Sequence, residues 1–587
     1  MSEIKYNQFP FVEVKGDFPV FQGWKSIGTQ LLTHLSMIPE RKKVVTVEYY
    51  QGVLEEAVTD ALVKQLQPVL LINTKCLMWH EDKIKKMTFQ DVTNDRIFGY
   101  ITRLNIDSYF DPEKVDMAKR YIESYPDGLV LIVGAGAAFI YPEHDLLVYA
   151  DMARWETQLR MHRHEVDNLG VYNRCVEDWM LLYKQGFFVD WRVLDRWKKK
   201  LMKRWDYVLD TNNRHEPKLV AGEGVIAGLN QAVNRPFSVV PFFDPGPWGG
   251  QWMKKYCHLD PEVNNYAWCF NCVPEENSLL LKFGDAVVEI PSINLVFHQP
   301  RKLLGDSVHA RFGDEFPIRF DFLDTIEGGN LSLQVHPLTE YIQEKFGMHY
   351  TQDESYYMMH AVPGAKVYLG LKDGVDPEAM ICDLETAQAG GAPFEAEKHV
   401  GVWPVNTHDH FLIPAGTVHC SGAGSMVLEI SATPYIFTFK MWDWGRLGID
   451  GKPRPINIEH GKNVIQWDRT ESWTRKHLIN QIETIAEGDG WKEERTGLHE
   501  REFIETRRHW FSKKVTVKAN DSVHVICLVE GEEILVESPV NTFEPFEVHY
   551  AETFIVPAAA GDYTMKPFGD GTGKQCATML AFVRKNA

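Results

Sequence analysis

The chain has 587 residues, 44% of them hydrophobic and 24% charged, with a formal net charge of −19. These fractions are ordinary for globular proteins and exclude disorder as the main state. The acidic balance argues against broad binding of nucleic acids or anionic membranes, because both require a basic surface. We see no secretory signal pattern and no apolar run long enough to cross a bilayer. The nine cysteines are scattered, so we predict a cytoplasmic protein without a disulfide framework.

One stretch departs from the acidic balance. Residues 191–205 interleave seven basic residues with tryptophans. As a helix, the stretch places Leu194, Trp197 and Leu201 on one stripe and most of the basic residues around the other side. We interpret it as a solvated basic face rather than a phosphate or RNA patch, and we expect no nucleic-acid partner.

The chain changes character along its length. Strand-like and helix-like runs alternate up to about residue 165, as in parallel βαβ units. Short apolar strands separated by Gly, Pro, Asn and Asp turns dominate after about residue 235, which favours a sandwich or barrel. We therefore predict a multidomain α/β plus all-β protein. Its parts are an α/β domain (1–165), a helical connector (166–235), a metal-binding β-domain (236–500) and a second β-domain (501–587).

The first strand–turn–helix of the α/β domain lies where a nucleotide-binding loop would sit. Such a loop needs clustered glycines followed by a lysine and a hydroxyl residue. If Gly52 is the last loop glycine, Val53 replaces the lysine and Leu54 replaces the hydroxyl residue. A second, weaker signal is the pair Gly134 and Gly136, which we interpret as a turn requirement.

Three arginines, Arg154, Arg160 and Arg163, follow the strand LLVYAD on an expected helix. With the alternating pattern, this segment resembles the arginine-bearing part of P-loop small-molecule kinases. The resemblance is topological and covers about 120 residues. It implies a degenerate kinase-like domain that has lost phosphoryl transfer, with a structural or regulatory role favoured over nucleotide sensing.

The strongest signal in the chain is a set of potential metal ligands. Gln334 and His336 are two residues apart in the strand pattern LSLQVHP, so they face the same side. Glu354 follows at a distance that fits the neighbouring strand, and FLIPAGTVH presents His419 after a tight turn. One amide oxygen, two imidazoles and one carboxylate suit a borderline divalent ion such as Zn²⁺. The same ligands tolerate other divalent metals, so the sequence predicts one metal site and leaves the ion open.

The motifs around these ligands resemble those of class I mannose-6-phosphate isomerases, which are cupin proteins. The matching runs are PWGG (247–250), NLSLQVHP (330–337), IPAGTVH (413–419) and DWGRLGIDGKPRP (443–455). The resemblance covers about 350 residues and implies double cupin β-barrels. It also implies that Gln334, His336, Glu354 and His419 bind one Zn²⁺ per chain. The second barrel, near residues 501–584, lacks a comparable ligand set and is expected to be structural.

The resemblance also implies a reaction and a substrate. It predicts interconversion of mannose 6-phosphate and fructose 6-phosphate through an enediol, with a sugar phosphate as the small-molecule partner. Lys440 stands where the family usually has an arginine near the substrate, and Arg446 matches the arginine of the DWGR run. Trp248 belongs to the entry motif. For Lys440 and Arg446 the alternatives are an ordinary strand lysine and a structural salt bridge.

The surroundings of the predicted metal site depart from the family pattern. The family usually has a lysine in the strand before LSLQVHP, where this chain has Asp321, with Arg319 two residues earlier on the same face. A carboxylate suits a sugar hydroxyl better than a phosphate. Two alternatives therefore stay open, an isomerase of a different or unphosphorylated sugar and a non-catalytic sugar sensor. The sequence does not indicate the oligomeric state.

Overall fold

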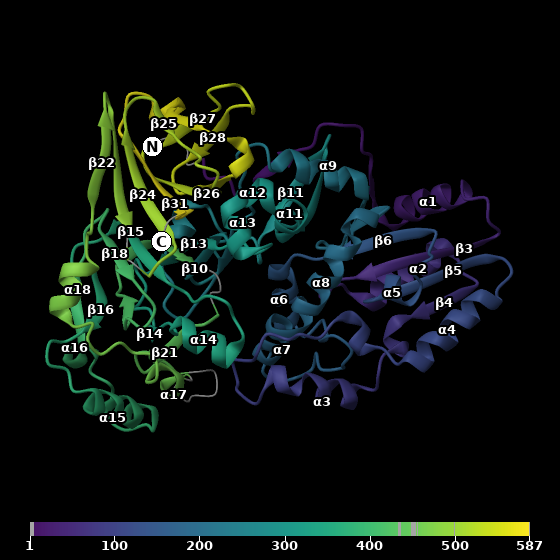
Figure 1. Cartoon of the computed structure of the whole chain (residues 1–587), viewed down its shortest axis with the longest axis horizontal. Coiled ribbons are helices and arrows are strands. Elements are labelled where there is room, and N and C mark those ends of the chain that lie inside the picture. The colour runs from purple at the N-terminus through teal and green to yellow at the C-terminus, as the bar shows by residue number, and fades with distance from the viewer. Residues whose placement is uncertain are drawn as a thin grey trace. The chain divides into compact units, whose positions relative to one another are not determined.

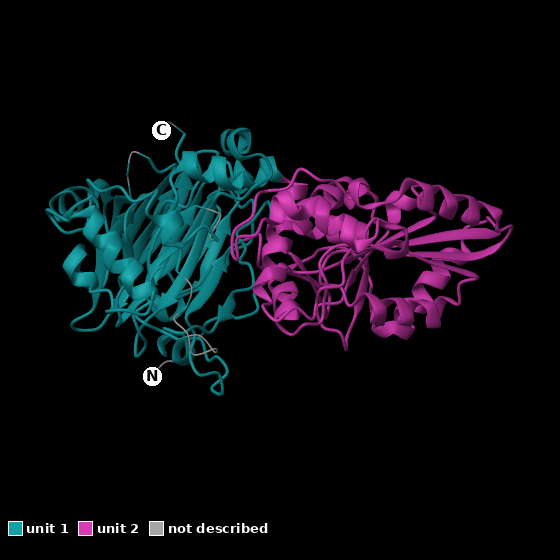
Figure 2. Cartoon of the chain, turned by 90° about the horizontal axis from the view of Figure 1, so that it is seen from below, with its two compact units in different colours: residues 1–10, 233–273, 300–587 teal, residues 11–232, 274–299 magenta. Residues whose placement is uncertain are grey.

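The computed structural model describes residues 5–432, 436–447, 454, 456–497, 499 and 501–585. Part of the DWGRLGIDGKPRP run, residues 448–453 and 455, therefore lies outside the described residues. The chain forms two compact units, shown in different colours in Figure 2. We call residues 11–232 and 274–299 the α/β unit, and residues 1–10, 233–273 and 300–587 the β unit.

The α/β unit is built on a seven-stranded sheet in the order β2-β8-β7-β6-β3-β5-β4. Strands β7, β6, β3, β5 and β4 run parallel to one another. The four strands expected from the sequence are present as β3 (Lys42–Tyr49), β4 (Leu70–Asn73), β5 (Gly128–Gly134) and β6 (Leu146–Asp151). Helices α2 (Glu55–Leu66), α3 (Glu81–Val92) and α4 (Pro112–Ser124) connect them (Figure 1). The predicted parallel βαβ pattern is therefore confirmed for this part of the chain.

Local sequence explains why these elements start where they do and why they pack. Asp111 accepts a hydrogen bond from the backbone N–H of Glu113, and Pro112 occupies the first turn of α4, a favourable helix start. Side chains from the sheet and from α4 form one hydrophobic core, which contains Val44, Ile72, Val130, Ile132, Ala118 and Ile122. The apolar runs of the central strands are buried on both faces, as parallel sheets require.

The predicted helical connector, 166–235, is not a separate element. It contains α7 (Met180–Gln185), α8 (Trp191–Leu201) and α9 (Gly222–Ala232), but also two strands, β7 (Tyr207–Asp210) and β8 (Lys218–Ala221). Strand β7 pairs with β6, and antiparallel β8 then pairs with β2 (Val20–Gln22). The segment therefore extends the sheet of the α/β unit. Four-residue strands between longer helical patterns give too weak a periodic signal to be recognised in the sequence.

A second correction concerns residues 274–299, which were expected in the metal-binding domain. Strands β11 (Ser278–Phe283) and β12 (Ala286–Pro291) form a three-stranded sheet with β1 (Phe11–Glu13). This small sheet and α11 (Ile293–His298) belong to the α/β unit. The chain thus leaves the α/β unit and returns to it once, which a boundary drawn from composition cannot reveal.

The basic stretch in α8 is less solvated than predicted. Lys198 is fully buried, and its Nζ lies 2.7 Å from Oδ1 of Asp151 at the end of β6. Asn294 donates a hydrogen bond of 2.7 Å to the other oxygen of Asp151. Arg196 donates to the carbonyl oxygens of Thr102 and Leu104. Much of the positive charge is therefore used inside the α/β unit rather than displayed on its surface.

The β unit contains two pairs of antiparallel sheets. The first pair consists of a six-stranded sheet, β18-β15-β20-β13-β10-β9, and a five-stranded sheet, β17-β16-β19-β14-β21. The strands of the six-stranded sheet are β9 (Phe242–Asp244), β10 (Trp268–Cys272), β13 (Ile318–Asp324), β15 (Glu354–Ala361), β18 (His410–Ile413) and β20 (Ser425–Ala432). Those of the five-stranded sheet are β14 (Leu333–Val335), β16 (Lys366–Leu371), β17 (Val400–Pro404), β19 (His419–Ser421) and β21 (Phe439–Trp442).

The second pair consists of a six-stranded sheet, β22-β23-β24-β31-β26-β29, and a four-stranded sheet, β25-β30-β27-β28. The strands are β22 (Glu483–Gly488), β23 (Trp491–Gly497), β24 (Ile504–Phe511), β25 (Val515–Val517), β26 (His524–Glu530), β27 (Glu533–Glu537), β28 (Phe546–His549), β29 (Thr553–Val556), β30 (Tyr563–Pro567) and β31 (Cys576–Val583). Phe511, Leu528 and Val536 belong to one hydrophobic core that both sheets share. Because β22 and β23 belong to this pair, it begins before the predicted boundary at residue 501.

Helices cover the ends and connections of the β unit. They are α10 (Trp252–Tyr256), α12 (Pro300–Leu304), α13 (Asp306–Phe312), α14 (Thr339–Phe346), α15 (Pro377–Gln388), α16 (Ala396–His399), α17 (Ile458–Gly461) and α18 (Glu471–His477). The many antiparallel sheets are consistent with the expected cupin-like fold in this part of the chain. Among the described residues, no helix is both long and apolar enough to cross a membrane.

Candidate metal centre

The predicted ligands come from both sheets of the first pair. Gln334 lies in β14, and His336 follows that strand directly. His419 begins β19 and is the cross-strand partner of Gln334. Glu354 begins β15 in the other sheet. The two sheets therefore bring together residues that are up to 85 positions apart in the chain.

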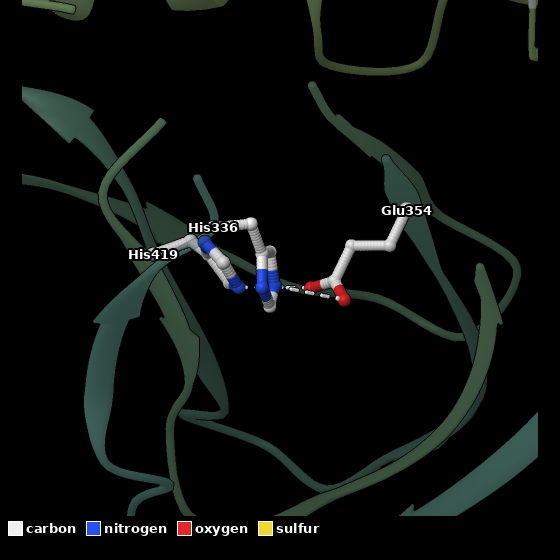
Figure 3. A group of neighbouring side chains, drawn as sticks. All are labelled: His336, Glu354 and His419. Carbon is white, nitrogen blue, oxygen red and sulfur yellow. Dashed lines mark ion pairs between the residues drawn. The ribbon is translucent and has the colours of Figure 1, made fainter. Parts of the chain in front are cut away.

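The side chains of His336, Glu354 and His419 converge on one point (Figure 3). Nε2 of His336 lies 3.0 Å from Oε2 of Glu354, and Nε2 of His419 lies 2.8 Å from Oε1. One ligand atom from each of the three residues lies within 4.8 Å of the others. Glu354, His336 and His419 are all buried.

Hydrogen bonds on the far side of each ring orient the two imidazoles. Nδ1 of His336 lies 3.1 Å from the carbonyl oxygen of Phe437, and Nδ1 of His419 lies 2.9 Å from that of Thr417. A carbonyl oxygen only accepts, so each Nδ1 carries a proton and each Nε2 is directed at Glu354. Backbone support of this kind is typical of histidines that bind metals.

This arrangement fits a cation. In neutral rings, two nitrogen lone pairs face a carboxylate, and the charge repulsion is relieved when a positive ion lies among them. Although the contacts are short, Nε2 of His336 and Oε1 of Glu354 have no hydrogen-bond partner of good geometry. Buried polar atoms without partners are unfavourable and point to a missing ligand. Burial raises the pKa of the Glu354 carboxyl, but the positive charge that His336 and His419 carry when protonated outweighs burial and holds that pKa well below its ordinary value.

Gln334 lies at the edge of this group. Its side-chain amide is buried and lies 3.3 Å from Nε2 of His419. The oxygen and nitrogen of an amide are assigned from hydrogen bonding, and a rotation of the amide would present its oxygen to the same point. The structure thus brings all four predicted ligands together.

Lys440 lies beside the predicted ligands. It belongs to β21 and is the cross-strand partner of Gln334, so the two side chains share one face of the sheet. Burial, together with the nearby charges of Arg454 and Arg446, lowers the pKa of Lys440 to about 8. A lysine with this pKa is partly neutral near physiological pH and can accept a proton.

The inner face of the opposite sheet is polar next to Glu354. Arg319 and Asp321 lie two residues apart in β13 and form a buried ion pair. Strand β20 lies between β13 and β15, and pairs Ser431 with both Arg319 and Glu354. Burial raises the pKa of Asp321 to about 6, with Arg319 acting against that rise.

Glu429 is a site residue that the sequence analysis did not identify. It is buried in β20 and is the cross-strand partner of both Asp321 and Tyr356. Burial and the nearby charge of Glu354 raise the pKa of Glu429 well above its ordinary value. The signal was the alternation in SMVLEISA, where Glu429 and Ser431 interrupt an otherwise apolar strand.

Two predicted residues are engaged in structural contacts. Arg446 forms an ion pair of 2.6 Å with Asp443 and donates to the carbonyl oxygen of Asn330. Trp248 is buried and packs edge-to-face on Trp268, with ring centroids 4.6 Å apart. The salt bridge considered as the alternative for Arg446 is therefore present.

Comparisons with known proteins place this geometry in context. The mannose-6-phosphate isomerase ManA of Bacillus subtilis is 23% identical over 342 residues, which is 58% of this chain and 95% of that protein. A mannose-6-phosphate isomerase of Streptococcus mutans is 26% identical over 220 residues, 37% of this chain and 64% of that protein. A crystal structure of the mannose 6-phosphate isomerase from Bacillus subtilis covers 59% of this chain and 99% of its own, with 18% identity and a TM-score of 0.47.

The chain is homologous to mannose-6-phosphate isomerases over 58% of its length. A separate match covers residues 23–234, which fit a family described as "Domain of unknown function (DUF8485)". That match spans the predicted boundary at residue 165 and agrees with the extent of the seven-stranded sheet. It gives no support to the expected kinase-like origin.

Structural contacts also account for the two glycine signals of the α/β unit. Gly52 has a φ of +100°, and a Cβ atom there would lie 2.4 Å from Oγ1 of Thr157. The backbone N–H groups of Gly136 and Ala138 donate to the carboxylate of Glu48. Burial raises the pKa of Glu48 to about 7, although these hydrogen bonds oppose the rise. The turn at Gly136 thus directs its N–H groups to Glu48 rather than to a phosphate.

The three arginines of helix α6 (Arg154–His162) and its end are likewise committed. Arg154 pairs with Asp195, and Arg160 donates to the carbonyl oxygens of Gly52, Thr211 and Asn212. Arg163 pairs with Glu156 and Glu165. The predicted arginine-bearing helix exists, but its guanidinium groups hold the α/β unit together.

Proposed function

We propose that the chain is a metal-dependent aldose–ketose isomerase that interconverts mannose 6-phosphate and fructose 6-phosphate through an enediol. The observation that carries this proposal is the convergence of His336, His419 and Glu354, with Gln334 beside them. The names of the homologues support a sugar-phosphate isomerase at low sequence identity.

The four residues would hold one divalent ion per chain, and their nitrogen and oxygen donors suit Zn²⁺. Such an ion supplies electrophilic stabilisation of the negative charge that develops on a sugar oxygen during proton abstraction. Glu354 and the neutral rings of His336 and His419 provide the charge and the lone pairs that retain the ion.

Lys440 is our proposed proton carrier. Isomerisation moves a proton between the adjacent carbons C1 and C2, so one base can remove it and return it. The amine of Lys440 lies on the same sheet face as Gln334, and its pKa of about 8 allows both protonation states. Arg446, whose charge helps to lower that pKa, acts through Lys440 rather than on the sugar.

Two classes of substrate, a phosphorylated and an unphosphorylated sugar, are compatible with the proposed reaction. Asp321 lies in the row of polar residues that leads to Glu354, and its pairing with Arg319 neutralises the cation that could meet a phosphate. This observation favours a second candidate, an isomerase of an unphosphorylated sugar. In that case, the Asp321 carboxylate would accept hydrogen bonds from sugar hydroxyl groups.

One experiment distinguishes an isomerase of sugar phosphates from an isomerase of unphosphorylated sugars. The zinc-loaded chain is incubated with mannose 6-phosphate or with mannose, and formation of the ketose is followed by NMR. Turnover of the phosphate supports the first candidate, and turnover of mannose alone supports the second. Absence of turnover with both sugars, in protein that retains its metal, contradicts both candidates and favours a non-catalytic sugar-binding role.

A further inference from the structure

A cavity of about 380 Å³ lies in the α/β unit, apart from the proposed metal centre. It opens at the carboxyl ends of three parallel strands, next to Tyr49 of β3, Asn73 of β4 and Ala135 after β5. The loop of residues 165–174 and the start of α2 complete its wall. Ligands of open α/β sheets bind at this edge, and the volume is typical of small-molecule sites.

The wall contains a buried polar atom with no partner. Gln51 is 7% exposed, and its Nε2 donates to Oδ2 of Asp190 at 3.1 Å. Its Oε1 forms no hydrogen bond. The hydroxyl of Thr74, also buried in the wall, has no partner either. Both oxygens are almost completely enclosed by the chain, so they make the region behind the wall polar without offering a surface to a ligand.

Most charges in the wall are paired with one another. Nζ of Lys75 lies 3.5 Å from Oδ2 of Asp167. Arg174 lies 3.6 Å from Glu56, whose side chain is almost fully exposed. Each of the two cations that line the cavity thus faces a carboxylate already present in the chain.

Glu55 is the exception. The remaining carboxylate of the wall, Glu165, pairs with Arg163 and Arg214, which leaves Glu55 with no hydrogen bond or ion pair among the described residues. Burial raises the pKa of the Glu55 carboxyl, and the charge of Lys75 only partly opposes that rise. Glu55 is half-buried in the wall, and a partly desolvated carboxylate without a partner is stabilised when a cation or a donor reaches it.

The same charges disfavour a phosphate. The first turn of α2, where an anion would bind, carries Glu55 and Glu56. Val53 and Leu54 occupy the positions that a nucleotide-binding loop gives to lysine and a hydroxyl residue. A nucleoside triphosphate would bring several negative charges to an excess of carboxylates.

Part of the wall is apolar or aromatic. Val53, Leu54, Val166, Leu169 and Leu194 line the cavity together with Tyr172. We propose that the α/β unit binds a small organic amine here, with its ammonium group on Glu55 and its apolar body against these side chains. The residues involved lie within the part of the chain that matches the family of unknown function.

The test uses ligands of one size that differ only in their head group. Cyclohexylmethylamine, cyclohexylmethanol and cyclohexanecarboxylate are titrated into the full chain by calorimetry, with ATP and Mg²⁺ as a fourth ligand. We expect the amine to bind at least tenfold more tightly than the alcohol, and the carboxylate and ATP to give no heat of binding. Equal affinities for the amine and the alcohol, or tightest binding of the carboxylate or ATP, would overturn the proposal.

Three variants locate the binding. Glu55→Gln should abolish the preference for the amine, Glu55→Asp should retain it in part, and the neighbouring Glu56→Gln should leave it unchanged. Thermal unfolding confirms that each variant is folded before titration. An equal loss in Glu55→Gln and Glu56→Gln, or a full preference that survives Glu55→Gln, contradicts the assignment of Glu55.

Discussion

Nε2 of His336 lies 3.0 Å from Oε2 of Glu354, although the two residues belong to opposite sheets of the β unit. Each side chain is buried, and the ring is supported from behind by the carbonyl oxygen of Phe437. This contact joins the sheets through polar atoms rather than through apolar packing. The stability of the first sheet pair should therefore depend on whether a cation is bound between the imidazole and the carboxylate.

Zinc should stabilise the protein through this contact. An ion that binds only the folded state adds about 2.7 kcal/mol at a free concentration 100 times its dissociation constant. We expect Zn²⁺ to raise the unfolding temperature of the wild type in differential scanning calorimetry. Glu354→Gln should lose most of this rise. The rise should persist in His360→Ala, a control with an exposed histidine in the same strand, and equal rises in all three proteins would contradict the assigned ligands.

The pH dependence of the reaction should follow the protonation state of the Lys440 amine. Its pKa is lowered to about 8, and only the neutral amine accepts a proton, so kcat/KM should rise with pH up to about 8 and then level off. Lys440→Met should lower kcat by about 10²-fold to 10⁴-fold. Lys462→Met, at the residue that follows helix α17 directly, is the control. A pH profile of the same shape in Lys440→Met and the wild type would remove Lys440 from the reaction.

Asp321 should weaken the binding of a phosphorylated sugar. Asp321→Asn removes a negative charge near Glu354 and frees Arg319 from its ion pair. We expect KM for mannose 6-phosphate to fall about tenfold, which corresponds to about 1.4 kcal/mol, with no change for mannose. A rise in KM for either sugar would instead place the carboxylate in the sugar-binding site.

Lys198 should be essential to the stability of the α/β unit. Lys198→Met leaves the Asp151 carboxylate buried without its cation, a change that costs about 3–5 kcal/mol. Lys200→Met, two residues along the same helix but exposed, should change stability by less than about 0.5 kcal/mol. Urea unfolding followed by tryptophan fluorescence measures both. Equal midpoints for the two variants would show that the buried pair contributes nothing.

Long periodic runs were predictable from the sequence, and short ones were not. The strand at residues 42–49 and the helix at 55–66 were expected within two residues of their observed bounds, because their apolar patterns are unambiguous. Strands β7 and β8 have four residues each and lie between the helical patterns of α8 and α9, so their segment was expected to be helical. The return of the chain to the α/β unit at residues 274–299 depends on pairing with β1, which no local pattern encodes.

The candidate metal ligands were recognisable because they fall in short motifs with fixed spacing, and their side chains lie close together in the structure. Their surroundings depend on pairing between distant strands. Glu429 comes next to Glu354 only through the register of β20 with β15. The sequence alone did not decide whether Arg446 contacts the substrate or forms a salt bridge, and in the structure it pairs with Asp443. The burial of Lys198 likewise depends on Asp151, 47 positions away.

The most direct test of the proposed function is conversion of mannose 6-phosphate to fructose 6-phosphate by the zinc-loaded chain and by its His419→Ala variant. We expect the wild type and His360→Ala to convert the sugar phosphate. His419→Ala should lose both its bound zinc and its turnover. Turnover that survives in His419→Ala without bound metal would contradict the metal centre. A wild type that holds zinc but converts no mannose 6-phosphate would contradict the proposed substrate.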